Sequence, residues 1–335
     1  MADPLEGELG DPEAGLRRIP PLLEEEGSAH RQAEKPGHIQ VSRGRGETRA
    51  RGAVLQATLS VLITAAPLAG VDAQDAPAIG KGTLLLAGGA YGPGVLEKFA
   101  SIAGGSSALL YYIPSASSGI RLPSGFIWSP PEEKDATGNT EAFEAELAKH
   151  FGVGRVRVLH SRDRAAWDGP LADSLREATA VWLSEGNAGR LAGLILGTRT
   201  ERELARLLSR GGIVGGNSAG SIIMGSFIVR GRPDKPVLVA RGHDRGFGWL
   251  RNVAINPHLT EAKRENELIN VLDAHPELLG IGLDEQAALL VRGTRFEILG
   301  TGRVAIYDDR LHDGRWFYYL TPGTTFDLSN RSTIP

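Results

Sequence analysis

Short apolar runs alternate with amphipathic stretches from residue 81 onward. Four of these runs have the length and composition of strands buried in a sheet, namely 83–87, 108–113, 155–159 and 180–183. Between them, residues 140–150 and 200–208 carry charges at the spacing of an exposed helix face. Strands that alternate with helices predict a parallel α/β sheet, in which ligands bind at the C-terminal ends of the strands.

The last third of the chain has a different pattern. Its apolar runs follow one another with only Gly- or Asp-containing turns between them, at 287–291, 295–299, 304–307 and 316–320. Because no helical period separates these runs, we expect an antiparallel meander that extends the main sheet.

Residues 1–52 show neither a helical nor a strand period and are rich in Glu, Arg, Pro and Gly. Such a composition cannot bury enough apolar surface to offset the entropy that ordering costs, so we expect this lead to be disordered.

An apolar run without charged residues follows the lead over 53–70, shortly after several arginines. The basic flank, the apolar core and the small residues of Val71-Asp72-Ala73 together predict a signal peptide over 53–73, cleaved after Ala73. A buried helix or an uncleaved membrane anchor is the alternative. Because a signal peptide lies at the N-terminus, we expect translation to start further in, for example at Val41.

The composition excludes several classes of site and of protein. The 335 residues include no cysteine, which excludes disulfides, thiolate metal sites and a cysteine nucleophile. The 37 basic and 40 acidic residues create no general attraction for nucleic acid, and 41% hydrophobic residues exclude a polytopic membrane protein. With the lead and the signal set aside, we expect a single catalytic domain over 81–330.

The strongest chemical signal is a glycine-rich stretch at 211–221. It contains Gly216-x-Ser218-x-Gly220 at a predicted strand-to-helix turn, which is the context of a nucleophile elbow. Glycines on both sides of the serine allow strand and helix to approach closely, and the helix N-terminus directs the N–H of Ala219 at a developing oxyanion. A glycine-rich phosphate cradle is the alternative.

A nucleophilic serine needs a base, and His258 is the best placed of the eight histidines. It follows the predicted strand 253–255, just as Glu285 follows the strand 279–283, so we expect both at the edge where ligands bind. Such a carboxylate orients the imidazole and stabilises its charged form. In an α/β-hydrolase such as an esterase, the catalytic residues follow the order Ser, acid, His along the chain. In this sequence only His312 could be the histidine of that order.

The motifs together resemble peptidase family S51, which includes cyanophycinase and the dipeptidase called peptidase E. The resemblance spans about 81–328 and rests on five stretches: Glu185-Gly186-Asn187, Gly216-Asn217-Ser218-Ala219-Gly220, 246–250 with His258, 280–285 and 322–328. It implies a class I glutamine amidotransferase-like (flavodoxin-like) α/β fold with a C-terminal antiparallel β extension. It further implies a Ser-His-Glu triad, no metal, no cofactor and a homodimer.

Carried over by motif, the resemblance makes Ser218 the nucleophile, His258 the general base and then the acid, and Glu285 the orienting carboxylate. Asp234 is the alternative acid, because an acidic residue shortly after the serine has been proposed to act in this family.

The resemblance also assigns the oxyanion hole and the substrate contacts. The backbone N–H groups of Gly186 and Ala219 would hold the oxyanion. Residues expected to contact substrate share a position near these motifs: Asn187, Asn256, Lys263 and Arg264.

This chain departs from cyanophycinases at several of these positions. Cyanophycinases have Gly-Gly-Asp/Asn-Gln where this chain has Glu185-Gly186-Asn187-Ala188, an acidic residue in place of Asn256, and an arginine in place of Ala262. These departures do not favour cyanophycin itself as the substrate.

The sequence therefore predicts a secreted, cyanophycinase-like serine exopeptidase, periplasmic or extracellular, that cleaves peptide or isopeptide bonds through an acyl-enzyme. The alternatives are a serine esterase with the same elbow and a non-catalytic amidotransferase-like binding module. Its expected partner is a peptide or isopeptide substrate, with no nucleic acid and no membrane span once the signal is removed.

Overall fold

A computed structural model of the chain describes residues 79–133, 138–235 and 237–335. The predicted lead over 1–52 and the predicted signal peptide over 53–73 lie outside these residues. Within the described ranges, every helix is too short or too polar to cross a lipid bilayer.

The main sheet has nine strands in the order β16-β15-β12-β11-β1-β7-β6-β2-β5. Five neighbouring strands run parallel: β1 (Thr83–Ala87), β7 (Ile213–Asn217), β6 (Ala180–Leu183), β2 (Leu109–Ile113) and β5 (Arg155–Val158). All but β5 are buried along their whole length, as strands covered on both faces must be. The predicted parallel sheet is confirmed, and its four predicted strands begin and end within one residue of the expected positions.

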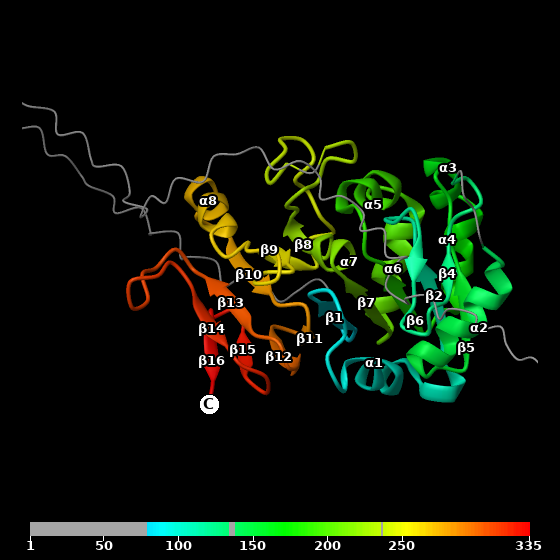
Figure 1. Cartoon of the computed structure of the whole chain (residues 1–335), viewed down its shortest axis with the longest axis horizontal. Helices are drawn as coiled ribbons and strands as arrows, with labels where there is room; N and C mark the ends of the chain where they lie inside the picture. Colours follow the sequence, from blue (N-terminus) through cyan, green and yellow to red (C-terminus); the bar gives the residue numbers. More distant parts are fainter. Residues whose placement is uncertain (1–78, 134–137, 236) are drawn as a thin grey trace, which may run out of the picture. The chain divides into compact units, whose positions relative to one another are not determined.

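Helices cover both faces of this parallel half (Figure 1). Two longer helices pack on each face: α1 (Val95–Ala103) and α2 (Thr140–Phe151) on one, α5 (Ala188–Ile195) and α6 (Arg199–Ser209) on the other. Strand residues alternate between these two cores, since Leu85 packs with α1 and α2 whereas Leu84 and Leu86 pack with α5 and α6.

Shorter elements complete this half of the molecule. They are α3 (Arg164–Trp167), α4 (Pro170–Ser174), η1 (Gly105–Ser107), η2 (Leu175–Glu177) and a hairpin of β3 (Ile120–Arg121) and β4 (Ile127–Trp128). The hairpin is anchored because Trp128 is buried and stacks on Phe143 of α2, with 5.0 Å between ring centroids.

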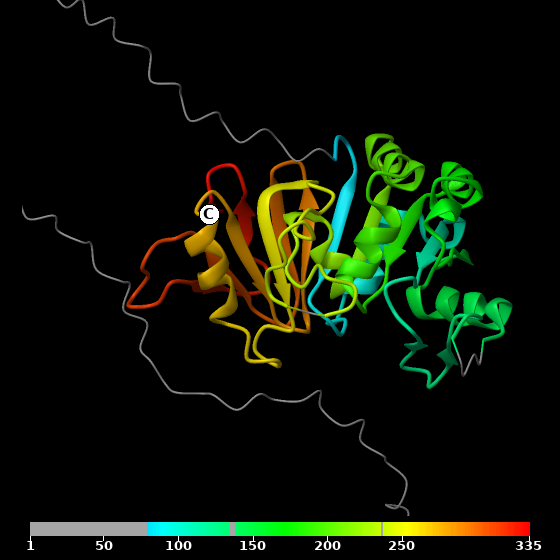
Figure 2. The ribbon, with the colours of Figure 1, turned by 90° about the horizontal axis from the view of Figure 1, so that it is seen from above.

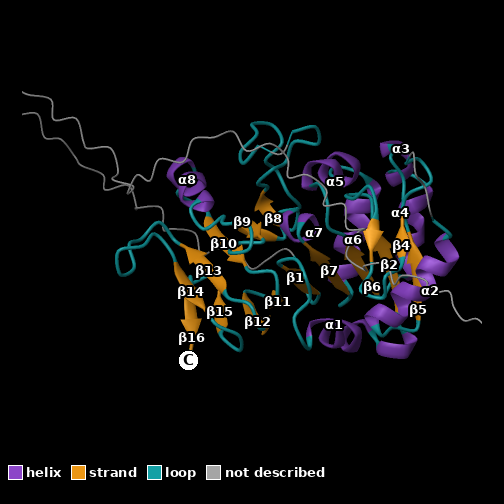
Figure 3. Ribbon diagram, viewed as in Figure 1, coloured by secondary structure: helices purple, strands orange, loops and turns teal. Residues whose placement is uncertain are grey.

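The other half of the main sheet is antiparallel. Its strands, outward from β1, are β11 (Ala287–Arg292), β12 (Arg295–Gly300), β15 (Thr325–Asp327) and β16 (Ser332–Ile334). This is the antiparallel extension that the sequence predicts, and Figure 3 shows that strands dominate this end of the molecule.

A second sheet has five strands in the order β14-β13-β10-β9-β8. Two of the four apolar runs that were expected in the meander form strands of this sheet. Its strands are β8 (Gly225–Phe227), β9 (Leu250–Pro257), β10 (Leu279–Leu283), β13 (Val304–Tyr307) and β14 (Tyr318–Leu320), with α8 (Glu267–Ala274) between β9 and β10. The prediction that the runs 304–307 and 316–320 extend the main sheet is therefore wrong. Gly300, at φ 84°, ends β12, and the fully buried β13 then pairs with β10.

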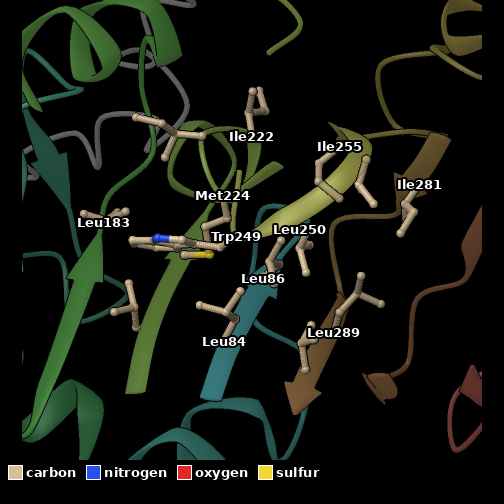
Figure 4. Close-up of a cluster of buried hydrophobic side chains, with 14 of the residues drawn as sticks. Leu84, Leu86, Leu183, Ile222, Met224, Trp249, Leu250, Ile255, Ile281 and Leu289 are labelled. Atoms are coloured by element: carbon tan, nitrogen blue, oxygen red, sulfur yellow. The ribbon is translucent and has the colours of Figure 1, made fainter. Parts of the chain in front are cut away.

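The two sheets meet across the larger hydrophobic core. Figure 2 shows the yellow and orange strands of the second sheet beside the cyan β1. Six buried side chains that Figure 4 labels come from both sheets: Leu84, Leu86 and Leu289 from the main sheet, and Leu250, Ile255 and Ile281 from the second. This shared core fixes the C-terminal end of β7 relative to the ends of β9 and β10.

Candidate active site

Ser218 lies in a strained turn between β7 and the one-turn helix α7 (Ala219–Ile222). Its backbone has φ 49° and ψ −110°, a conformation that residues other than glycine rarely adopt. Its N–H donates to the carbonyl of Ala87 at 3.1 Å. A Cβ on Gly220 would collide with the carbonyl of Leu183, so this glycine allows the close approach of helix and strand that the elbow requires.

His258 directly follows β9 and contacts both Ser218 and Glu285. Its Nε2 lies 2.8 Å from Ser218 Oγ, and its Nδ1 lies 3.0 Å from Glu285 Oε1. With the proton on Nδ1, the ring donates to Glu285 and accepts from Ser218. The backbone supports this placement, because the His258 N–H donates to the carbonyl of Gly88 at 3.3 Å and its φ is 54°.

Glu285 follows β10 in a turn that is tied to the turn of His258. The buried carboxylate of Asp284 accepts from Thr260 Oγ1, two residues beyond His258, and from the backbone N–H of Arg303 at 3.1 Å. The Glu285 N–H donates to Glu261 Oε1 at 3.1 Å. These bonds hold the catalytic histidine candidate and its carboxylate partner at a fixed separation.

Gly89, at the start of the loop between β1 and α1, makes room for this pair. A Cβ there would lie 2.7 Å from Cε1 of His258 and 3.0 Å from Cγ of Glu285. Sequence reasoning missed the roles of Gly89 and Asp284. Two features of the sequence could have indicated these roles: the Gly88-Gly89 pair after a predicted buried strand, and the acidic residue that precedes Glu285.

The three strand ends do not share one sheet edge, contrary to expectation. Strand β7, which precedes Ser218, belongs to the main sheet, whereas β9 and β10 run parallel to each other in the second sheet. The candidate triad therefore lies where the two sheets meet, a junction that periodicity along the chain cannot reveal.

The two residues predicted to form the oxyanion hole lie at the ends of neighbouring strands. Ala219 is the first residue of α7, where backbone N–H groups have no partner within the helix. Gly186 follows β6 with φ 129°, and a Cβ on it would collide with the carbonyl of Ala116. Their roles stay predictions.

Asn187 has a different role from the predicted substrate contact. Its Oδ1 caps α5 by accepting from the N–H of Arg190 at 2.7 Å. Its Nδ2 donates to the carbonyls of Arg232 and Pro233 at 3.3 Å each. Both amide groups are therefore used within the protein, and the contact of this half-buried side chain with substrate stays a prediction.

Asn256 is also used within the protein. It is fully buried in β9, where its Oδ1 accepts from Arg230 at 2.9 Å and its Nδ2 donates to Glu267 at 3.0 Å. The prediction that Asn256 contacts substrate is therefore wrong. Arg264 is half-buried and donates to the carbonyl of Pro257 at 3.1 Å, so it supports the turn of His258. Lys263 lies exposed in the same turn, and its substrate contact stays a prediction.

Neither alternative triad residue lies in the site. Asp234 is exposed and paired with Arg232, whose hydrogen bond lowers the pKa of that carboxyl. His312 lies between β13 and β14, with its Nε2 2.8 Å from Asp308 Oδ1. The Ser, acid, His order expected of an esterase is thus not assembled around Ser218, since His258 occupies the place of the base.

A cavity of about 490 Å³ opens beside His258 and Glu285. It is lined by residues 120–123 of the β3–β4 hairpin and by Tyr91, Tyr112, His150 and Glu185. Burial raises the pKa of Tyr91, with the charge of Glu185 as a second cause, and burial also raises the pKa of Tyr112, followed by the effects of Tyr91 and then Glu185. Both hydroxyls therefore stay protonated at neutral pH.

Glu185 presents a carboxylate to this cavity. Its Oε2 accepts from Asn217 Nδ2 at 3.2 Å, and Asn217 Oδ1 in turn accepts from Trp182 Nε1 at 3.1 Å. In the described part of the chain, no group of three or more His, Cys, Asp or Glu side chains is arranged to hold a metal ion.

The chain is similar in sequence to a family of known proteins. The family model described as Peptidase family S51 matches residues 83–299. The chain is 28% identical over 237 residues to the cyanophycinase of Geminocystis herdmanii, covering 68% of this chain and 81% of that protein. It is 30% identical over 239 residues to the cyanophycinase of Synechococcus elongatus, covering 69% of each.

A solved structure shares the fold. The crystal structure of a peptidase from an acI-B1 Actinobacterium matches with a TM-score of 0.54 and 20% identity, covering 73% of this chain and 96% of that one. The predicted class I glutamine amidotransferase-like α/β fold is confirmed, apart from the two strands that join the second sheet.

Proposed function

The chain belongs to peptidase family S51, as a cyanophycinase-like member, and we propose on that premise that it is a serine-type exopeptidase that forms an acyl-enzyme. One observation carries the proposal: Ser218 Oγ, the His258 ring and the Glu285 carboxylate are linked by contacts of 2.8 and 3.0 Å. This is the arrangement in which a base activates a serine and a carboxylate orients the base.

In the first half of the proposed reaction, Ser218 Oγ attacks the carbonyl carbon of the scissile amide while His258 Nε2 takes the hydroxyl proton. Glu285 stabilises the imidazolium that forms. The N–H groups of Gly186 and Ala219 would hold the tetrahedral oxyanion. The C–N bond then breaks, His258 gives its proton to the leaving amine, and the acyl group stays on Ser218.

In the second half, a water molecule replaces the amine and passes a proton to His258 as it attacks the acyl carbon. The ester bond to Ser218 breaks, and the proton returns to Ser218 Oγ. The strained turn of Ser218 favours both halves, because its φ of 49° presents Oγ to His258 without reorganisation of the backbone.

The cavity supports a short peptide or isopeptide end as the substrate. The hairpin residues 120–123 line it together with His258 and would limit how much of a substrate fits there, as in an exopeptidase. Within the described residues Glu185 has no ion-pair partner, so it favours a cationic group on the bound substrate. Glu185, Ala188 and Asn256 stand where cyanophycinases have other residues, and Asn256 is engaged within the protein, so cyanophycin itself is not favoured.

A panel of dipeptides and isopeptides, with β-aspartyl compounds and cyanophycin included, tests this function. The Ser218→Ala variant should lose about 10⁴- to 10⁶-fold in kcat on any compound that the parent cleaves. The exposed Ser209→Ala variant is the matched control and should keep the parental rate. Wild-type turnover by Ser218→Ala would refute the mechanism.

We also propose that the enzyme is exported after cleavage behind Ala73. The basic flank, the apolar run over 53–70 and the small residues before Gln74 support this. N-terminal sequencing of natively expressed protein should find Gln74 first, in the periplasmic or extracellular fraction. A mature chain that begins near Met1 would rule out this export signal.

A further inference from the structure

A second hollow, of about 680 Å³, borders the catalytic cavity. The side chains of Tyr91 and His150 line both spaces and form the wall between them. The hollow lies over α1 and the end of α2, which are neighbours on one face of the main sheet (Figure 1). Its other walls share this location: Pro93, Leu96, Glu97, Ala100, Lys149 and Phe151.

The shared wall is held in place by aromatic packing. The Tyr91 ring lies edge-on to Trp182 with 5.4 Å between centroids, and 5.6 Å from the ring of His150. Phe151 contacts the same tryptophan at 5.0 Å. Because Trp182 is fully buried in β6, these rings are fixed to the sheet, and the hollow is formed before any ligand binds.

The chain itself connects the two spaces. Gln286 lines the hollow and directly follows Glu285, which lines the catalytic cavity. The carbonyl of Gln286 accepts from the N–H of Thr301 at 3.1 Å, and Gly92 leaves room for it, since a Cβ there would collide with this carbonyl. The hollow thus begins one residue from the candidate triad, on a rigid turn.

We propose that the hollow is a subsite for the same peptide, and that it binds residues of an extended substrate beyond those held in the catalytic cavity. This inference rests on the proposed peptidase function. Its chemistry suits a peptide segment, because the exposed Pro93 and the half-buried Leu96 offer apolar surface while Glu97 and Lys149 lie exposed at its edge. The substrate class is therefore an oligopeptide rather than a free dipeptide.

A subsite of this kind raises kcat/KM for longer substrates, since binding energy from remote residues stabilises the transition state. The test uses the compound that the parent cleaves fastest in the panel above, and the same compound extended by two residues at one end and then at the other. Leu96→Trp and Glu97→Trp fill the hollow from the exposed side of α1. Lys98→Trp, on the same helix but outside the hollow, is the control.

The parent should cleave one of the extended compounds about tenfold more efficiently than the short one. Both filling variants should abolish that advantage and leave the short compound unaffected, while Lys98→Trp should keep it. Equal efficiency of the parent on short and extended compounds would overturn the subsite, and so would an advantage that survives both filling variants. If neither compound is cleaved by a Ser218-dependent route, the proposed function fails first, which distinguishes the two outcomes.

Discussion

At the scale of residues, Ser218, His258 and Glu285 meet because each lies just beyond a strand whose end is fixed by the core. Ser218 and His258 directly follow β7 and β9, and Glu285 comes two residues after β10. The sequence predicts all three from their positions after apolar runs. It does not predict Gly89 or Asp284, whose importance depends on contacts with residues more than a hundred positions away for Gly89 and about twenty for Asp284.

Glu285 and Asp234 are the two candidates for the acid of the triad, and one isosteric substitution at each distinguishes them. Glu285→Gln should lower kcat by about 10²- to 10⁴-fold, because an amide neither stabilises the imidazolium nor fixes the reactive tautomer. Asp234→Asn should leave kcat within about twofold, since that side chain is exposed and bonded to Arg232. Steady-state kinetics on one substrate compares them, and the reverse ranking would make Asp234 the triad acid.

Gly89→Ala should impair catalysis without unfolding the protein. The added methyl group must displace the His258 ring or Glu285, and such a displacement should lower kcat/KM by about 10- to 100-fold. Gly193→Ala is the matched control, because a Cβ at that helical position meets nothing within 4 Å. Circular dichroism should show native folding for both variants, and full activity of Gly89→Ala would contradict the close packing of the triad.

At the scale of elements, the turns after β9 and β10 act as one unit because Asp284 joins them. Asp284→Ala would leave the N–H of Arg303 and the hydroxyl of Thr260 without their acceptor, and should cost about 2–4 kcal/mol of unfolding free energy. The loss in kcat should exceed the change in KM, since Glu285 is misplaced.

Denaturant unfolding and steady-state kinetics measure both effects of Asp284→Ala. The exposed Asp273→Ala on α8 provides the comparison and should change neither. If Asp284→Ala destabilises the protein but keeps the parental kcat, Asp284 has only a structural role.

His160, which follows β5 and packs its ring edge-on to Trp128 of the β3–β4 hairpin, makes stability depend on pH. Burial, as the main cause, lowers the pKa of His160, whose Nδ1 lies 2.9 Å from Ser115 Oγ. The unfolded chain therefore binds this proton first as pH falls below about 6.5. The stabilisation is fully present above that pH and is lost as pH falls toward the lower pKa of the folded state.

Urea unfolding at pH 7.5 and pH 5.0 tests this dependence. His160→Gln should lose less stability between the two values than the parent does, because one proton-linked contribution is removed. The exposed His243→Gln variant should behave as the parent. An unchanged pH dependence in His160→Gln would show that carboxylates alone determine it.

At the scale of the whole molecule, the candidate site depends on the contact between two sheets. Four of the five parallel strands of the main sheet could be predicted to within one residue, since three of them are buried apolar runs and β5 has a regular alternating pattern. The assignment of β13 and β14 to the second sheet could not, because strand pairing is decided by partners far along the chain. For the same reason the sequence places the three triad residues at strand ends but not at the junction of two sheets.

The substrate contacts were the least predictable part. Asn187 and Asn256 stand in motif positions, but helix capping and the buried bond to Arg230 engage both amides. Glu185, which lines the cavity and accepts from Asn217, becomes a candidate for binding substrate only once its neighbours are placed.

The central claim is that His258, oriented by Glu285, activates Ser218 as a nucleophile. Labelling with a fluorophosphonate, followed by peptide mapping, tests it most directly, since only an activated serine reacts. The parent should carry one adduct on Ser218, Ser218→Ala should carry none, and His258→Ala should react at least about 100-fold more slowly. An adduct on another residue, or labelling of His258→Ala at the parental rate, would contradict the account.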